Sequence, residues 1–252
     1  MADRAAHDIN FEALTGLLSL RASPEVPGTL IGDIGAALHA AAGILAALYR
    51  RERTGGGAAV DVPIHDAALG WLLFPAARRL AGDADSGSID LPVSGSHACY
   101  NIYRTSDDRY VALGALEPKF WSAFCDRIGR RDLVPLQYIR GEAQARALDE
   151  IRALMQTRSQ ADWLALFRDV DVCLTPVLSV ADALSDPHCL ERGVVARYGG
   201  CTYVTSPIAI GSSSSRVEIR PAPALGAHTE QVFAEAGITR SDLAALRKEG
   251  IV

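Results

Sequence analysis

The chain has 252 residues and a formal net charge of −5, with 49% hydrophobic and 22% charged residues, the balance of a soluble globular protein. This mild acidity argues against nucleic-acid binding, which normally requires a strongly basic balance or stripe. The five cysteines have neither CxxC nor metal-ligand spacing, so we expect reduced thiols, no metal site and a cytoplasmic location. The charged N-terminus lacks the apolar core of a signal peptide.

The first third of the chain has a helical pattern. We expect a helix over residues 11–20, a long helix over 30–53, a short β run over 58–62 and a further helix over 64–80. Small side chains recur along the long helix and favour close packing against neighbouring backbone. Its apolar stretch, residues 34–49, is shorter than a bilayer span, so we interpret it as a buried helix.

Three glycines, residues 55–57, follow the long helix. Glycine commonly follows a helix C-terminus, and the arginines at 50, 51 and 53 suit the negative end of a helix dipole. A phosphate-binding loop is the alternative for this stretch. Such a loop normally precedes a helix, which favours the first interpretation.

The middle of the chain combines predicted strands and predicted helices. Residues 81–88 are small and polar, which predicts a linker, and two β runs at 100–105 and 110–114 flank a polar turn, which predicts a hairpin. Helices are expected at 118–130, 143–157 and 160–170, a strand at 172–178, β segments after Gly199, and two helices at 229–236 and 241–248. This order predicts two domains, the second inserted into the first.

Three titratable side chains stand in unusual settings. His7 precedes a helix, Asp33 lies in the first turns of the apolar helix, and Glu117 falls at a strand-to-helix turn. Each also has an ordinary structural explanation, because Asp8 or Asn10 could cap a helix and carboxylates are favoured near helix N-termini. Taken singly, none of the three predicts a function.

Taken together and in order, the motifs resemble one family. His7-Asp8-Ile9-Asn10-Phe11 resembles its GHDINY segment, with Ala6 and Phe11 in place of glycine and tyrosine. The other matching blocks are Asp33 with residues 43–48 and 53–57, the hairpin leading into residues 111–120, residues 171–177, and residues 225–230, where Ala227 replaces the usual glutamate. By these blocks the chain is similar to the family III CoA-transferases (CaiB/BaiF), and in particular to the α-methylacyl-CoA racemases.

The resemblance implies an α/β fold, the family III CoA-transferase fold, with an incomplete large domain and an inserted small α/β domain. Residues 1–62 would be the remainder of the large, CoA-binding domain, and 63–95 a helix and linker. Residues 96–197 would form the small domain, and 198–252 would return to the large domain with C-terminal helices. The family's N-terminal Rossmann-like region does not precede His7, which would leave Ala-rich helical surface exposed. A late start codon, a separate chain supplying that region and a true loss remain open.

The resemblance also implies a reaction. His7 and Asp33 would be the acid/base groups flanking C2 of a 2-methylacyl-CoA thioester, with Glu117 orienting the histidine. Removing a weakly acidic α-proton needs a positioned base and a stabilised enolate, and inversion needs a second group on the opposite face. Asp8 and Phe11 are expected to contribute to binding CoA, which enters as substrate. No other cofactor is expected.

Two alternatives stay open. CoA-transferases of this family use the aspartate at the Asp33 position as a nucleophile, without depending on the His/Glu couple, and the presence of His7 and Glu117 favours the racemase. The chain could instead be a non-catalytic fragment or a subunit that needs a partner chain. The expected partners are an acyl-CoA and a second copy in an interlocked homodimer, in which the partner subunit's Glu117 would complete the site; nucleic acid and membrane are not expected.

Overall fold

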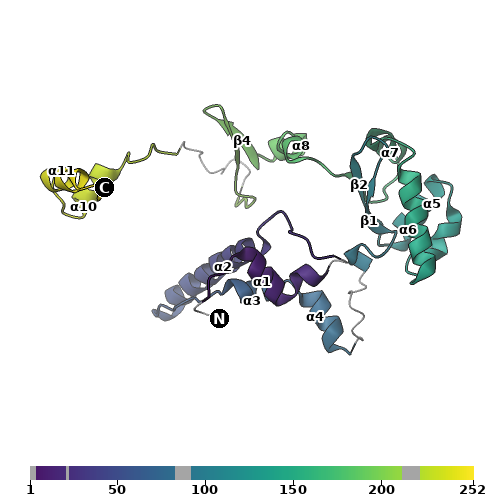
Figure 1. Cartoon of the computed structure of the whole chain (residues 1–252), viewed down its shortest axis with the longest axis horizontal. Coiled ribbons are helices and arrows are strands. Elements are labelled where there is room, and N and C mark those ends of the chain that lie inside the picture. The colour runs from purple at the N-terminus through teal and green to yellow at the C-terminus, as the bar shows by residue number, and fades with distance from the viewer. Residues whose placement is uncertain (1–3, 21–22, 83–91, 212–221) are drawn as a thin grey trace. The chain divides into compact units, whose positions relative to one another are not determined.

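The computed structural model describes residues 4–20, 23–82, 92–211 and 222–252 (Figure 1). Contacts within the chain define two compact units, Met1–Val177 and Leu178–Val252. The chain is mixed α/β, as predicted. The first unit holds the N-terminal helices and a three-stranded sheet with its own helices, and the described part of the second holds a β-hairpin and four short helices.

The N-terminal helices are α1 (Asp8–Thr15), α2 (Ile31–Thr54), α3 (Ile64–Gly70) and α4 (Leu73–Leu80), with a 3-10 turn at Leu17–Leu20. The single helix predicted over 11–20 is wrong, because α1 ends at Thr15 and is followed by Gly16, which takes φ 89. The single helix predicted over 64–80 is also wrong. A break separates α3 from α4, and Pro75 requires it because it has no N–H and would clash with the carbonyl four residues before it.

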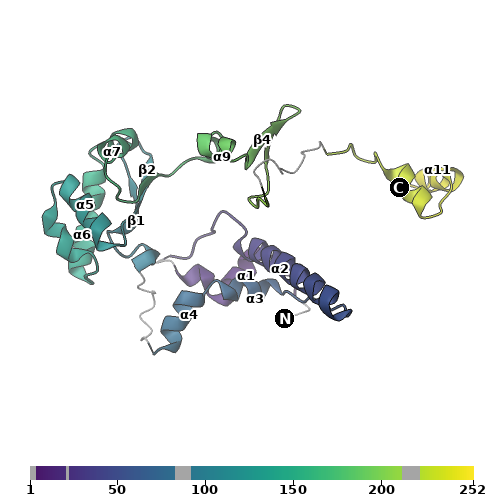
Figure 2. The same cartoon turned by 180° about the vertical axis from the view of Figure 1, so that it is seen from behind.

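Helix α2 packs on its neighbours through small residues, as predicted. A methyl group added to Gly35 would lie 2.6 Å from Trp71 Nε1, and one added to Gly43 would lie 2.8 Å from Val60 Cγ1. Both views of the chain show α1 and α3 beside α2 (Figures 1 and 2). Residues 58–62 are not a strand, since no described strand lies beside them to form a ladder, and they instead follow α2 as irregular chain.

Most of α2 is nevertheless exposed in this chain. Only Gly32, Gly35 and Ala36 are buried, whereas large side chains such as Leu38, Leu45 and Tyr49 are open to solvent. The expectation of a buried helix is therefore wrong for this chain, and the expectation of exposed Ala-rich surface is confirmed. At 24 residues, α2 is also long and apolar enough to cross a membrane, contrary to the sequence-based estimate. Length and composition alone are weak evidence for a span, because core helices of soluble proteins share them.

The C-terminal end of α2 follows the sequence prediction. Gly55 adopts φ 75, and its N–H donates to the carbonyl of Arg51 at 2.8 Å. Arg51 and Arg53 lie in the last turn, where a cation is favoured by the helix dipole. The glycine run is thus a helix end, as its position after the helix indicated.

The sheet of the first unit is antiparallel, in the order β1 (Tyr100–Arg104), β2 (Tyr110–Gly114), β3 (Leu174–Pro176). The predicted hairpin is confirmed, with Tyr103 opposite Val111. Helices α5 (Pro118–Arg127), α6 (Glu142–Met155) and α7 (Gln160–Leu166) accompany it, with 3-10 turns at Pro92–Ser94 and Arg131–Leu136. The predicted linker over 81–88 lies largely outside the described residues.

An aromatic core fixes these helices against the sheet. Trp121 stacks on Phe124 at 5.5 Å between ring centroids, Phe124 on Phe167 at 5.4 Å, and Trp163 on Phe167 at 6.4 Å. Both buried indole groups find acceptors, Trp121 Nε1 at the carbonyl of Leu133 (3.1 Å) and Trp163 Nε1 at that of Met155 (2.8 Å). The same buried cluster includes Val111 and Leu113 of β2, so the sheet and its helices share one core.

The second unit contains α8 (Val180–Leu184) and α9 (Pro187–Glu191), and then the antiparallel pair β4 (Val195–Tyr198) and β5 (Cys201–Val204). Two helices close the chain, α10 (Thr229–Glu235) and α11 (Arg240–Lys248), both as predicted. Residues 212–221, between them and β5, lie outside the described residues.

Candidate active site

His7 occupies the N-cap of α1 and is exposed. Its backbone N–H donates to Asn10 Oδ1 at 3.0 Å, and its carbonyl accepts from the N–H of Asn10 at 2.9 Å. These contacts fix the backbone of His7 at the start of the helix while its ring remains open to solvent. A histidine held in this way is accessible to a substrate.

Asp8, the next residue, does not cap its own helix. Its side chain is only 6% exposed, and its Oδ1 accepts the backbone N–H of Asp33 at 2.8 Å, 25 positions along the chain. That contact ties the first turn of α1 to the first turn of α2. Because His7 precedes Asp8 directly, the hydrogen bond places His7 and Asp33 at the starts of two helices in contact with each other.

Glu12 is a second buried carboxyl group on the same face of α1, four residues after Asp8. It is fully buried, and its Oε1 accepts the N–H of Ile31 at 3.2 Å. Its other oxygen, Oε2, lies in the interior without a well-formed hydrogen bond to any described residue. Burial raises the pKa of Glu12, as do hydrogen bonding to Asp8 and its charge, whereas the N–H groups of Ile31 and Gly32 lower it.

The sequence analysis did not single out Glu12. The signal available was its spacing from Asp8, together with Leu30, which precedes α2 and has no side-chain hydrogen-bond acceptor to cap it. A long helix without a local cap takes its acceptors from elsewhere in the fold. That requirement becomes visible only once α1 and α2 are seen to be neighbours.

Asp33 is the third residue of α2 and is half-buried. Its backbone is held by Asp8, but its own carboxylate forms no hydrogen bond or ion pair with the described residues. Gly32 permits the arrangement, since a methyl group there would lie 2.9 Å from Asp8 Oδ1. The carboxylate is therefore available for chemistry on a fixed backbone.

Glu117 lies where the sequence predicted, at the strand-to-helix turn between β2 and α5. It is the N-cap residue of α5, and its carbonyl accepts the N–H groups of Phe120 and Trp121 at 3.0 and 3.2 Å. Its side chain is exposed. No hydrogen bond or ion pair among the described residues joins Glu117 to His7 or Asp33, so its proposed contact with the histidine stays a prediction.

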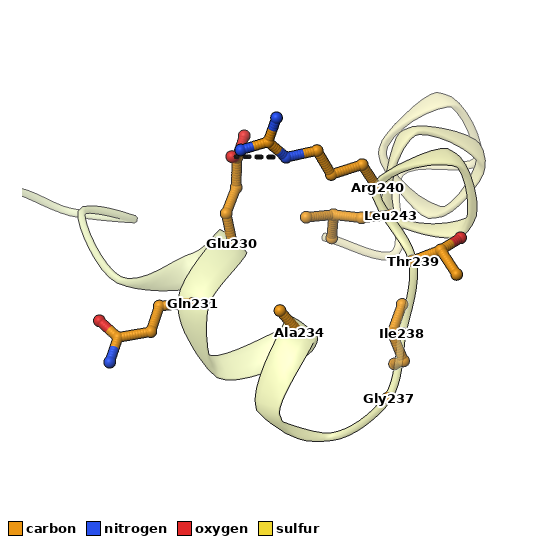
Figure 3. A pocket seen from close by; sticks show the side chains of 8 residues that line it. All are labelled: Glu230, Gln231, Ala234, Gly237, Ile238, Thr239, Arg240 and Leu243. Carbon is orange, nitrogen blue, oxygen red and sulfur yellow. Dashed lines mark ion pairs between the residues drawn. The ribbon is translucent and has the colours of Figure 1, made fainter.

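The remaining candidate features offer fewer groups that could act in catalysis. Phe11 is half-buried in α1, and its expected role in CoA binding stays a prediction. A pocket of about 540 Å³ lies between α10 and α11 (Figure 3), but its acidic residue, Glu230, faces Arg240 and Arg247 at 3.9 and 3.6 Å. None of the predicted site residues lines this pocket. The described residues contain no group of three or more potential metal ligands.

Comparison with known proteins shows which family and which proteins this chain is similar to. The model of CoA-transferase family III matches residues 1–229. Human α-methylacyl-CoA racemase is 29% identical over 98% of this chain and 66% of its own length, and mouse succinyl-CoA:glutarate CoA-transferase is 26% identical over 98% and 59%. A crystal structure of a CaiB/BaiF family protein from Brucella suis superimposes with a TM-score of 0.74 at 24% identity, over 93% of this chain and 64% of that one, which shows the fold. The chain spans less than two thirds of the length of these relatives.

Proposed function

The chain belongs to CoA-transferase family III, and on that premise we propose that it catalyses epimerisation of 2-methylacyl-CoA thioesters by proton transfer at C2. The observation that carries the proposal is the pairing of two unlike titratable groups, His7 and Asp33, at the starts of adjacent helices linked by one hydrogen bond through Asp8. Relatives with racemase and with CoA-transferase activity both match, so an enzyme of the isomerase or transferase class is supported.

The chemistry follows from the residue types. An imidazole titrates near neutral pH and can give or take a proton, and a carboxylate on the opposite face can do the reverse. The first-turn N–H groups of a helix have no intrahelical acceptors, and α1 directs such groups to the same region as His7. Donors of this kind stabilise the negative charge that develops on an enolate oxygen.

CoA transfer is the second candidate, with Asp33 as the nucleophile. It is favoured by the unpaired, half-buried carboxylate of Asp33 on a backbone fixed by Asp8. In that reaction the carboxylate attacks the thioester carbonyl, expels CoA thiolate and forms a mixed anhydride. The two reactions place different demands on His7, which the transfer does not require.

Assembly is part of the proposal. We infer that the working enzyme is a homodimer in which the partner subunit's Glu117 completes the site, and that it acts in the cytoplasm on an acyl-CoA. The exposed apolar face of α2, including Leu38 and Leu45, supports a covering surface beyond the described residues. A subunit that needs a second chain would expose the same face.

Deuterium incorporation separates the two reactions. The chain is incubated with a 2-methylacyl-CoA in D2O, its oligomeric state is measured by size-exclusion chromatography, and exchange at C2 is followed by NMR. Exchange that is lost in His7→Ala, with the variant still folded, supports the racemase. Absence of exchange by a confirmed dimer contradicts it. Hydroxylamine trapping of an acylated Asp33 in the presence of a carboxylic acid acceptor would favour CoA transfer instead.

A further inference from the structure

We propose that Glu12 is a positioning residue for Asp33, because its buried carboxyl group and that of Asp8 together fix the first turn of α2. The inference rests on the proposed function only for its catalytic consequence. The structural part concerns how the N-terminus of α2 is held. Measurements on that turn therefore test the structural part.

The N-terminus of α2 lacks a local cap. Leu30, in the N-cap position, has no side-chain acceptor, so the first N–H groups of the helix need partners from elsewhere. The first intrahelical bond runs from the N–H of Ile34 to the carbonyl of Leu30 at 3.0 Å. The N–H groups of Ile31 and Asp33 instead donate to Glu12 Oε1 and Asp8 Oδ1 at 3.2 and 2.8 Å. Two side chains of α1 thus perform the capping that one residue normally supplies.

The two carboxyl groups accept hydrogen bonds from different N–H groups of the same turn. Asp8 holds the backbone of Asp33 directly, and Glu12 holds Ile31, two residues earlier. A helix turn anchored at both positions cannot rotate about its axis without breaking one of these hydrogen bonds. The direction of the Asp33 side chain is therefore set by Glu12 as well as by Asp8. Placement at the positive end of the helix dipole partly offsets the cost of burying the two groups together.

Burial distinguishes Glu12 from an ordinary helix-capping carboxylate. The side chain is completely inaccessible to solvent, and Oε2 lacks a well-formed hydrogen bond within the described chain. A proton on Oε2 would reduce repulsion from the Asp8 carboxylate and leave Oε1 free to accept from Ile31. Glutamine has nearly the same shape and keeps one acceptor oxygen. Glu12→Gln should therefore preserve the turn, whereas Glu12→Leu removes the acceptor entirely.

Amide hydrogen exchange tests the structural part without any assay of activity. In the unmodified full chain, the N–H groups of Ile31 and Asp33 should exchange more slowly than free amides. Glu12→Leu should speed exchange across residues 31–33 by about tenfold, as expected for loss of one hydrogen bond, and Glu12→Gln by less than about threefold. Glu142→Gln serves as the matched control, since Glu142 is an exposed first-turn glutamate in α6.

The catalytic part is read from kinetics of C2 deuterium exchange. Glu12→Leu should lower kcat about tenfold or more and leave KM within about twofold, because Asp33 acts on bound substrate, and Glu12→Gln should recover most of kcat. Equal losses in the Leu and Gln variants, or unchanged protection of residues 31–33 in a folded Glu12→Leu variant, would overturn the inference. Unprotected Ile31 and Asp33 amides in the unmodified chain would overturn it even if Glu12→Leu fails to fold. Lack of C2 exchange by the unmodified chain would refute the proposed function and leave the amide result to decide the role of Glu12.

Discussion

Replacing Gly32 with alanine tests how tightly the two helix starts approach each other. The added methyl group would lie 2.9 Å from Asp8 Oδ1 and 3.3 Å from Ile64 Cγ2, so Asp8 must move away. Movement breaks its hydrogen bond to the N–H of Asp33, a loss of about 1.5–3 kcal/mol for a charged acceptor. Alanine in a helix gains about 0.5–1 kcal/mol over glycine, so we expect a net destabilisation of about 1–2 kcal/mol.

Urea unfolding followed by circular dichroism measures this difference. The matched control is Gly70→Ala, because a methyl group at Gly70 meets no atom within 4 Å and its φ is not in the positive range. The control should be neutral or slightly stabilising. If Gly32→Ala is as stable as the unmodified chain, or more stable, while the control behaves as expected, the close approach of the Asp8 carboxylate to α2 is refuted. C2 exchange should fall in parallel with the loss of the hydrogen bond.

Asp33→Asn should lower C2 exchange by about 10²-fold or more while the chain stays folded, and near-normal exchange would exclude Asp33 as an acid/base group. Burial raises the pKa of Glu12 above its ordinary value of 4.5, so the stability that neutral Glu12 provides is present below pH 4.5 and is lost as the pH rises through the raised pKa. Thermal unfolding across pH should therefore show Glu12→Gln gaining on the unmodified chain above pH 4.5, and a constant difference would contradict the shift. Burial raises the pKa of Cys99 to about 11 and of Cys125 to about 12, so a thiol reagent at pH 8 should label the exposed Cys201 and spare these two until the chain unfolds, as peptide mapping can show.

The candidate site divides into parts that were predictable and parts that were not. His7, Asp33 and Glu117 could be named from short motifs, because each motif is local and its residues lie within one turn or helix start. The β2–α5 turn carrying Glu117 was predicted for the same reason. A hairpin followed by a helix that begins with proline gives its signal in neighbouring residues. The amino-acid sequence also indicated that α2 ends where the glycine run begins, at Gly55.

The breaks within helices were harder to predict than the helices themselves. The apolar pattern over residues 64–80 continues through Trp71, so periodicity alone does not reveal the break before α4, which begins at Leu73 and has Pro75 in its first turn. Residues 58–62 have strand-like composition, yet a strand also needs a neighbour, and the described chain supplies none beside them. The composition of residues 58–62 cannot show whether a neighbouring strand is present.

What the amino-acid sequence determined by itself was the family, the β1–β2 hairpin, the C-terminal helices and the three candidate residues, because these depend on local patterns and on motif order. Tertiary structure alone decided that Asp8 serves α2 instead of its own helix and that Glu12 is buried beside it. The physical reason is that both depend on contacts between segments far apart in the sequence, at a helix start with no cap of its own. Glu12 contacts Ile31, 19 positions later, and Asp8 contacts Asp33, 25 positions later. Local sequence sets which groups need hydrogen-bond partners, and only the packing of α1 on α2 sets which groups provide them.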